Sequence, residues 1–324
     1  MLTDEKILIT GPAGRIAFGL ARTLAPDNEV WGISRFRDAA ARERVDALGV
    51  TTRAVDIADG DFADLPTDFT YLLHIAADFS DPDYDRALTV NAEGSGLLLE
   101  HCRKAKAALV MSTVTTYKPH PEPWHPFRED DPLGDAMLPG QLPYSISKIA
   151  EEAVARYCAR SFNLATTIAR MCCAYGERGG VPVWHMDNIA AGKPVYARWD
   201  PLPYSPIHDD DISGQLEALL DAASVPATIV NWGGDNPVSI QQWCEYLGEL
   251  LNMTPNIVVN EVPGASIGSV ADHTKRASIT GPSQVHWREG LRRLVEQFYS
   301  DRVKVPDLNQ LRPRPSAFEP VRKR

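Results

Sequence analysis

The N-terminal stretch from Lys6 to Leu24 constrains the fold more than any other part of the chain. A short apolar run, Lys6–Thr10, leads into a glycine-containing turn, and residues of helical character follow from Ala17. A strand, a glycine turn and a helix in this order are the context that a dinucleotide-binding fingerprint requires. Gly11 would permit the tight turn, and Gly14 would let the backbone approach a pyrophosphate at the helix N-terminus. A glycine turn with a purely structural purpose is the alternative.

The alternation of apolar strands and helices continues along the chain. We predict further strands at residues 29–34, 51–55, 71–75, 108–111, 164–170 and 227–232. Such alternation is typical of an α/β fold, in which a doubly wound parallel sheet carries helices on both faces. In this Rossmann-type arrangement, ligands bind beyond the carboxyl ends of the strands. The sequence therefore predicts a ligand site at these ends, and Thr113 lies at one of them.

The end of the second predicted strand bears on the identity of the nucleotide. An acidic residue there accepts hydrogen bonds from the adenosine ribose and favours NAD, whereas arginine suits the 2′-phosphate of NADP. This chain has Ser34 and Arg35, with Arg37 close by. We therefore predict NADP in preference to NAD, although two solvated arginines at the start of a helix would give the same pattern.

A tyrosine and a lysine stand four residues apart where a later helix is expected to begin. Residues at this spacing share a helical face, so Lys148 can hold its charge beneath the phenol of Tyr144. A free tyrosine, with a pKa of about 10, is a poor acid or base at neutral pH. Lowering that pKa by roughly three takes on the order of 4 kcal/mol, which a close cation in a water-poor cleft can supply. The pair alone is a weak indication, because this spacing is common on helices.

The charge and the apolar content of the chain indicate which partners and which cellular compartment to expect. The 324 residues include 33 Lys and Arg against 43 Asp and Glu, a formal net charge of -10, whereas nucleic-acid binding requires clustered basic residues. We predict no nucleic-acid and no membrane partner, since no segment has about 18 uninterrupted apolar residues and no signal-like pattern opens the chain. These features favour a cytoplasmic protein. The five cysteines are expected to be buried free thiols, and no metal site is expected, although His120 and His125 lie close in sequence.

The motifs together resemble those of the extended short-chain dehydrogenases/reductases, the superfamily that includes the NAD(P)-dependent epimerases and dehydratases. The resemblance covers roughly residues 5 to 300, with motifs in the family's order: Thr-Gly-x-x-Gly-x-x-Ala from Thr10 to Ala17, Asp56-Ile57, His-x-Ala-Ala from His74 to Ala77, Asn91, Thr113 four residues ahead of Tyr117, and Tyr144 to Lys148. It implies that Tyr144 is the general acid/base, that Lys148 lowers its pKa and binds the nicotinamide ribose, and that Thr113 hydrogen-bonds the reacting oxygen. Ser112 is the alternative hydroxyl. The implied cofactor contacts are Gly11, Gly14, Arg15, Ile16, Arg35, Asp56, Ile57, Ala76, Ala77, Asn91, Tyr144, Lys148 and Met171.

The same resemblance divides the chain between the sheet and a smaller C-terminal domain that covers the substrate. We assign residues 1–175 and 207–235 to the NADP-binding Rossmann domain and residues 176–206 and 236–301 to the substrate-binding region. Residues 302–324, rich in proline and basic residues, are expected to form an extended tail. Members of the family commonly form homodimers through the catalytic helix, and a homodimer is expected here.

Two positions depart from the pattern of the nucleotide-sugar relatives. Those relatives place an Asn near the end of the sixth strand and Arg-Asp before an Ile-His segment, and both help to bind a sugar diphosphate. Here Cys173 and Tyr204-Ser205-Pro206 occupy these positions, and Arg198 is the only evident basic candidate nearby. Because a diphosphate needs charge-assisted donors, we predict a pocket of apolar and aromatic groups instead. The candidates lie in the Pro119–Pro143 loop and in residues 176–204: Trp124, Phe127, Trp184, Trp199 and Tyr204.

The leading hypothesis is an NADP-dependent oxidoreductase. It would transfer a hydride between the nicotinamide and a carbonyl, secondary alcohol or enone of a mostly apolar small molecule. The first alternative is a nucleotide-sugar epimerase or dehydratase, which would keep its NAD(P) bound and regenerate it within one turnover. The second alternative is a non-catalytic dinucleotide-sensing module, which the presence of Thr113, Tyr144 and Lys148 disfavours.

Overall fold

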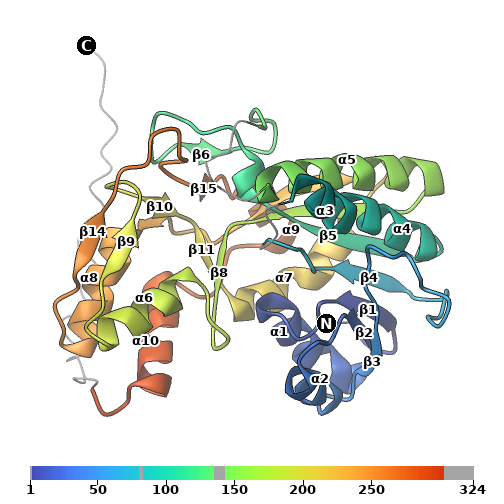
Figure 1. Cartoon of the computed structure of the whole chain (residues 1–324), viewed down its shortest axis with the longest axis horizontal. Coiled ribbons are helices and arrows are strands. Elements are labelled where there is room, and N and C mark those ends of the chain that lie inside the picture. The colour runs from blue at the N-terminus through green and yellow to red at the C-terminus, as the bar shows by residue number, and fades with distance from the viewer. Residues whose placement is uncertain (1, 80–82, 135–142, 303–324) are drawn as a thin grey trace.

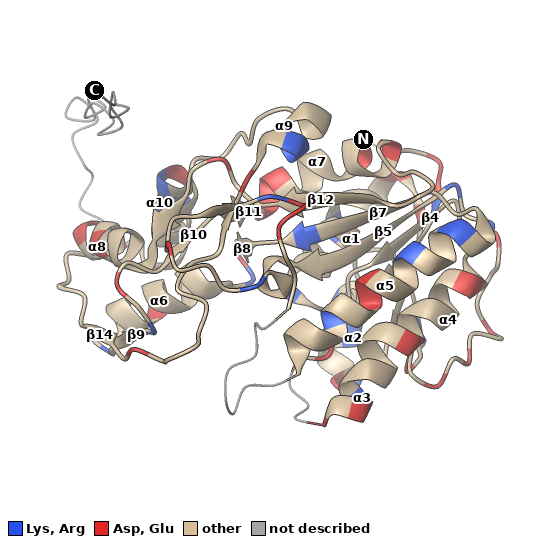
Figure 2. Ribbon diagram, turned by 90° about the horizontal axis from the view of Figure 1, so that it is seen from above, with Lys and Arg blue, Asp and Glu red and all other residues tan. Residues whose placement is uncertain are grey.

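The structure is a computed structural model that describes residues 2–79, 83–134 and 143–302. Two lobes lie side by side, a larger one built on a central sheet and a smaller one built mainly of helices (Figure 1). From the perpendicular direction, basic and acidic residues are interspersed on the outer helices of the larger lobe (Figure 2). The predicted tail lies outside the described residues from residue 303 onward.

The larger lobe is organised around a seven-stranded sheet whose neighbouring strands all run parallel, in the order β12-β7-β5-β4-β1-β2-β3. The strands are β1 Lys6–Thr10, β2 Glu29–Ser34, β3 Thr51–Ala54, β4 Tyr71–His74, β5 Ala107–Thr113, β7 Thr166–Met171 and β12 Thr228–Trp232. Strands β4, β5 and β7 are buried along their whole length, as expected where helices cover both faces. The predicted α/β fold with a doubly wound parallel sheet is confirmed.

Helices cover the two faces of this sheet (Figure 1). Helices α1 and α7 bury leucines against one face, and α4 and α5 pack against the other. The helical segments of this lobe are α1 Arg15–Leu24, η1 Ala25–Asp27, α2 Ala39–Asp46, α3 Tyr84–Leu88, the π-helical turn η2 Thr89–Glu93, α4 Gly94–His101, η3 Val114–Thr116, α5 Tyr144–Phe162, α7 Asp209–Asp221 and α9 Thr274–Thr280. Within the part of the chain that the structure describes, no helix has both the length and the apolar character needed to cross a membrane.

The strand order places the ligand-binding edge of the sheet. β1 pairs with β2 on one side and with β4 on the other, so the direction of winding reverses between β1 and β4. In open α/β sheets a crevice forms outside the carboxyl ends of the strands at this reversal. The glycine turn after β1 and the segment after β4 therefore face each other across the crevice.

The smaller lobe has a hydrophobic core of its own, which includes Met186, Trp243 and Leu291. Its helices are α6 Val181–Ala190, α8 Ile240–Leu251 and α10 Trp287–Phe298, and the short strands outside the main sheet are β6 Pro126–Phe127, β8 Cys173–Tyr175, β9 Val195–Ala197, β10 Pro203–Tyr204, β11 Pro206–His208, β13 Val238–Ser239, β14 Ile257–Val259 and β15 Val270–Ala271. Ser239 caps α8, where it accepts a hydrogen bond from the backbone of Gln242 in a capping box. The predicted domain boundaries near residues 175, 206 and 235 stay predictions.

Helix α7 begins earlier than the sequence pattern indicated. The apolar pattern in the sequence begins only at Gln215, but the helix starts at Asp209, and the ring of His208 accepts a hydrogen bond from the backbone of Asp210. Asp209, Asp210 and Asp211 fill its first turn, where the helix dipole favours negative charge. The carboxylate run therefore stabilises a helix end.

Candidate active site

A cavity of about 550 Å³ lies beyond the carboxyl ends of the central strands and reaches α6 of the smaller lobe. Every residue predicted to act in catalysis or to contact the cofactor lines this cavity, except Asn91. The lining residues from that prediction are Gly11, Gly14, Arg15, Ile16, Arg35, Asp56, Ile57, Ala76, Ala77, Thr113, Tyr144, Lys148 and Met171. The fold thus brings these residues together, while their individual roles stay predictions.

The glycine turn after β1 forms a cradle at one end of the cavity. Gly11 has a φ of +63°, a conformation that glycine adopts without the usual steric cost. A Cβ added to Gly11 would lie 3.2 Å from the Cβ of Ala76, so the turn and the segment after β4 are in close contact. Gly14 begins α1 without a side-chain cap, which leaves the first N–H groups of the helix for a ligand. This geometry fits the pyrophosphate of a dinucleotide.

Arg15 links the glycine turn to a helix far along the chain. Its Nη1 lies 3.2 Å from Oδ1 of Asp209, in the first turn of α7. Burial raises the pKa of Asp209, and the charge of Arg15 opposes that rise. Asp209 also packs so closely over Gly176 that a Cβ there would meet its carboxylate. This contact was not predicted, since no local pattern in the sequence connects the two segments.

The end of β2 presents a basic side chain to the cavity. Ser34 and Arg35 both line it, and Nη1 of Arg35 lies 3.9 Å from Oδ2 of Asp78, a long ion pair on a side chain that is 40% exposed. Asp56, at the neighbouring strand end, forms a closer pair of 3.0 Å with Arg86. Arg35 therefore remains available to an anionic group at this end of the cavity.

Asn91 lies behind the cavity wall. In the π-helical turn η2, its Oδ1 accepts a hydrogen bond of 2.7 Å from the backbone of Asp78, and its Nδ2 donates to the backbone oxygen of the same residue. Nδ2 also donates to Oγ of Ser147 at 2.9 Å. Asn91 thus holds the segment after β4 against α5, and it does not line the cavity with the other predicted residues.

Tyr144 is the first residue of α5, and the side chain of Thr113 at the end of β5 acts on its phenol and lowers the pKa. The ring of Phe79 meets the tyrosine ring edge-on, with centroids 6.4 Å apart. The sequence predicts that Lys148 lowers the pKa of Tyr144. The lysine charge does act in that direction, but burial raises the pKa more strongly and the carboxylate of Glu151 adds to the rise. The net pKa of Tyr144 is therefore raised.

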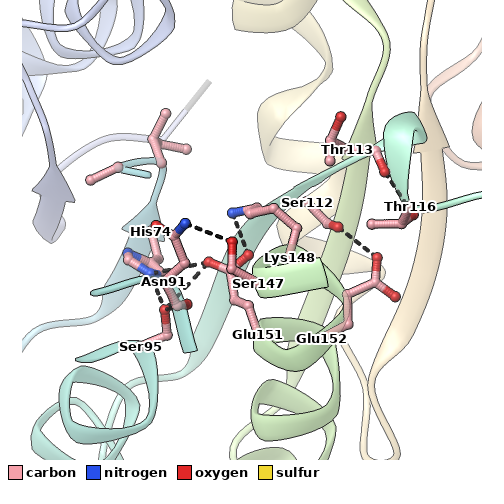
Figure 3. A network of polar contacts seen from close by, with 12 residues as sticks. His74, Asn91, Ser95, Ser112, Thr113, Thr116, Ser147, Lys148, Glu151 and Glu152 are labelled. Atoms are coloured by element: carbon pink, nitrogen blue, oxygen red, sulfur yellow. Dashed lines mark hydrogen bonds and ion pairs between the residues drawn. The ribbon is translucent and has the colours of Figure 1, made fainter. Parts of the chain in front are cut away.

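The alternative hydroxyl, Ser112, has a different partner. Its Oγ donates a hydrogen bond of 2.6 Å to Glu152 (Figure 3). Glu152 also forms a buried ion pair with Arg170 at 2.7 Å. Since this hydroxyl is directed into the Glu152–Arg170 pair, Thr113 is the one that contacts Tyr144.

Lys148 is buried and forms an ion pair with Glu151, one helical turn further along α5. Within the described residues, its Nζ makes no hydrogen bond of regular geometry, so a buried donor is left at the cavity wall. A ribose hydroxyl would satisfy such a donor. Glu151 itself was missed at the sequence level.

The far end of the cavity is lined by residues that carry no cation. They are Phe79, Cys172, Cys173, Ala174, Gly180, Val181 and Trp184. The cationic residues that line the cavity are Arg15, Arg35 and Lys148. Burial raises the pKa of Cys172 to about 11, which disfavours its thiolate at neutral pH. This end is shaped for apolar contacts more than for phosphate.

Most of the other aromatic candidates lie elsewhere. No residue in the described part of the predicted loop, 119–134 with Pro143, lines the cavity; residues 135–142 lie outside the description. Phe127 stacks on Tyr117 at 4.9 Å instead. Trp199 and Tyr204 pack against the core of the smaller lobe, so of the aromatic candidates Trp184 alone reaches the cavity within the described residues. Arg198 donates a hydrogen bond to the backbone of Ser266 at 2.6 Å.

Two comparisons with known proteins agree with this architecture. The sequence model of the NAD dependent epimerase/dehydratase family matches residues 7–198. A search of curated proteins found no match. Among solved structures, UDP-glucuronic acid 4-epimerase from Bacillus cereus, in complex with UDP-glucuronic acid and NAD, has 22% identity and a TM-score of 0.78 over 91% of this chain and 100% of that chain.

Two further structures have the same architecture. UDP-glucose 4-epimerase from Thermotoga maritima, with UDP-glucose, has 22% identity and a TM-score of 0.77 over 91% of this chain and 99% of that chain. dTDP-glucose 4,6-dehydratase from Bacillus anthracis, in complex with NAD, has 18% identity and a TM-score of 0.77 over 92% of this chain and 97% of that chain. At these identities the likeness shows the fold.

Proposed function

The chain belongs to the NAD dependent epimerase/dehydratase family, of the extended short-chain dehydrogenase/reductase type, and from this premise we propose that it oxidises and re-reduces a sugar nucleotide within each turnover. The family match and the three nucleotide-sugar enzymes of the same fold support this function, the first alternative at the sequence level, better than the leading hypothesis of an apolar-substrate reductase. The observation that carries the proposal is the placement of Thr113, Tyr144 and Lys148 on one cavity wall beyond the strand ends.

The residues on that wall have complementary tasks. Thr113 would hydrogen-bond the oxygen of the reacting carbon, beside the phenol of Tyr144. During oxidation Tyr144 would take the hydroxyl proton as the carbon loses a hydride, and during reduction it would return the proton to the oxygen. Lys148 would hold the nicotinamide ribose with its unsatisfied buried donors. The bound nicotinamide supplies the acceptor and donor of the hydride.

For the cofactor we propose NADP in preference to NAD. Support comes from Ser34 and Arg35 at the end of β2, where both side chains line the cavity and no carboxylate takes the position. Two of the three solved structures name NAD, so the preference for NADP is not taken from them. The distinction therefore depends on Arg35, whose guanidinium can pair with a 2′-phosphate.

A second candidate function keeps the apolar substrate. The far end of the cavity has Cys173 where nucleotide-sugar relatives have an Asn, and Trp184 lines the same region. A hydrophobic ketone or enone would gain about 25 cal/mol for each Å² of apolar surface buried there. This observation favours net reduction of an apolar compound by NADPH.

One experiment separates the two candidates. The purified protein, without added cofactor, is incubated with UDP-glucose, UDP-glucuronic acid or dTDP-glucose, and the products are followed by nuclear magnetic resonance. In parallel, NADPH oxidation is followed with a set of hydrophobic ketones and enones, and Tyr144→Phe serves as the control in both arms. Conversion of a sugar nucleotide by retained cofactor supports the first function. NADPH consumption with the hydrophobic set alone would replace it with the second.

We also propose a homodimer formed through α5. Ile146 and Tyr157 on this helix are 37% and 66% exposed, and Leu97 on the adjacent α4 is 42% exposed. Residues 11 positions apart on a helix lie close to the same face, so Ile146 and Tyr157 point in one direction. Light scattering tests the assembly, and Tyr157→Glu should shift it toward the monomer. An unchanged dimer in that variant would indicate that the interface is formed by another surface.

A further inference from the structure

A buried carboxylate stands against the active-site lysine. Lys148 is 1% exposed and Glu151 is fully buried, and their side chains form an ion pair within α5 (Figure 3). Lys148 lies one turn after Tyr144, so a single helix face carries a phenol, a cation and then an anion in sequence. The anion competes with the phenol for the one positive charge on this face.

The far side of Glu151 is held by hydrogen-bond donors. Its Oε1 lies 3.3 Å from Oγ of Ser95 and 3.4 Å from Nε2 of His74, while the serine hydroxyl makes its shorter hydrogen bond, of 2.6 Å, to the backbone oxygen of Asn91. All three side chains are buried, on α5, α4 and β4 respectively. The carboxylate is therefore fixed from outside its own helix.

The tautomer of His74 follows from its other neighbour. Oγ1 of Thr10 accepts hydrogen bonds from the backbone N–H groups of Ile75 and Ala76, at 2.9 and 2.8 Å. Its own hydrogen is then directed to Nδ1 of His74, 3.0 Å away. The ring proton is therefore assigned to Nε2, which faces Ser95 and the carboxylate. This arrangement anchors the carboxylate without placing a second cation on it.

We propose that Glu151 is a positioning residue of the active site, which holds Lys148 through the buried ion pair and thereby weakens the lysine's stabilisation of the Tyr144 phenolate. The role rests on the proposed function of Tyr144 as general acid/base. Because the lysine charge is shared with the carboxylate, the phenol of the resting enzyme favours its protonated form.

The electrostatics of the site agree with this role. Lys148 lowers the pKa of Tyr144, whereas Glu151 raises it, and burial raises it further. The phenol is acted on by Lys148 and Glu151 from α5 and by Thr113 from β5, and its ring meets Phe79 from the segment after β4. Behind Glu151 lie His74 of β4 and Ser95 of α4. Asp78 lines the same cavity and is paired to Arg35. Glu152, the adjacent buried carboxylate, is paired with Arg170 and is not among the charges that act on the phenol.

The test is a titration of the phenol that needs no substrate. Tyrosinate absorbance is measured against pH in the wild-type chain and in Glu151→Gln, and in each case the same curve from a Tyr144→Phe derivative is subtracted. Loss of a negative charge near the phenol should lower the pKa of Tyr144 by about one or more. Glu152→Gln is the matched control and should leave the tyrosinate curve unchanged. Thermal unfolding followed by circular dichroism establishes that each variant is folded.

The outcomes separate this role from the proposed function. An unshifted curve in folded Glu151→Gln would overturn the positioning role, whatever the turnover of the enzyme. If Glu151→Gln does not fold, Glu151→Asp takes its place, because it withdraws the carboxylate by one methylene; no shift in folded Glu151→Asp would overturn the role equally. An equal shift in Glu152→Gln would also overturn it, by showing a general effect of helix charge. Full turnover in Tyr144→Phe would remove the proposed function while leaving the titration result standing.

Discussion

The two ends of the cavity are built in different ways. The cofactor end is formed largely by backbone, at the turn of Gly11 and Gly14 and at the N-terminus of α1. The substrate end is formed by side chains from the segment after β4, from β8 and from α6, which come together only in the folded chain. Backbone recognition tolerates little variation, because Gly11 has a φ of +63° and a Cβ at Gly11 or Gly14 would lie only 3.2 or 3.0 Å from its nearest neighbour, whereas the side chains opposite can change with the substrate. Membership of the family therefore predicts the structure of the cofactor end far better than that of the substrate end.

Tyr144→Phe should reduce turnover more than a change at the cofactor end or at the substrate end of the cavity alone. Removal of the phenolic proton should lower turnover by at least about a hundredfold, the usual scale for a general acid/base. Binding of the dinucleotide should be nearly unchanged, since the backbone cradle lies at the other end. Turnover and cofactor affinity are measured side by side. Most of the activity remaining in the variant would exclude the proposed mechanism and favour protonation of the product by water.

Arg35→Ala tests the cofactor end alone. A charge-assisted contact with a 2′-phosphate is worth roughly 1.5–3 kcal/mol, or about ten- to a hundredfold in affinity. The variant should lose that factor for NADP and bind NAD as before, which titration of both nucleotides measures. Arg37→Ala is the control, because Arg37 is not among the lining residues. Equal binding of NAD and NADP by the unaltered chain would refute the preference.

The fold and the cofactor end could be predicted because their signals are local. Alternating strands and helices, the Gly11 turn and the spacing of Tyr144 and Lys148 each depend on residues close in sequence. A serine directly before an amphipathic stretch, as at Ser239, likewise marks a helix start locally. The start of α7 has no such mark, because an apolar pattern shows where a helix is buried and not where its polar first turn begins.

The rest depends on contacts between distant segments. Asp209 meets Arg15 across 194 positions, and no local pattern indicates that pairing. Glu151 and Glu152 both follow Lys148 within about one helical turn, so spacing does not tell which of them contacts the lysine. In the structure Glu152 binds Ser112 on β5, and Glu151 forms the ion pair with Lys148. Among the aromatic candidates, spacing likewise did not separate Trp184 from those that pack into the smaller lobe.

A signal for the substrate end was nevertheless present. Gly179 and Gly180, with φ of +105° and +115°, are followed by Pro182 in the first turn of α6. A glycine pair before a proline near a helix start indicates a tight turn into that helix. A Cβ on Gly180 would lie 2.5 Å from the backbone oxygen of Ala174, so this turn places α6 directly over β8. The same turn brings Trp184 to the cavity.

Trp184→Ala tests the substrate end alone. Its ring lines the cavity and is 58% exposed, so a bound substrate can cover it. Loss of that contact should cost about 1–2 kcal/mol of substrate affinity, roughly five- to thirtyfold, with no change in dinucleotide affinity. Trp124→Ala is the matched control, because Trp124 is also exposed but lies off the cavity. The measurement is KM with each class of substrate; an equal effect of both changes would contradict the assignment of Trp184.

Cys173→Asn is the mildest change and sharpens the choice between the two substrate classes. Cys173 lines the cavity at the position where nucleotide-sugar relatives have an Asn, and burial keeps its thiol protonated by raising its pKa. An amide there adds a donor toward a sugar nucleotide, and one hydrogen bond is worth about 0.5–1.5 kcal/mol, or roughly two- to tenfold in affinity. Thermal shift and calorimetry with UDP-glucose, in the presence of NADP, should show tighter binding, while a hydrophobic ketone should bind equally or less well because the new amide must be desolvated. Cys172→Ser is the control, because the Cys172 sulfur already donates to the backbone oxygen of Ser269 and a hydroxyl can do the same. Weaker binding of the sugar nucleotide in folded Cys173→Asn would indicate that the pocket is shaped for an apolar substrate, and it would favour the reductase over the epimerase or dehydratase.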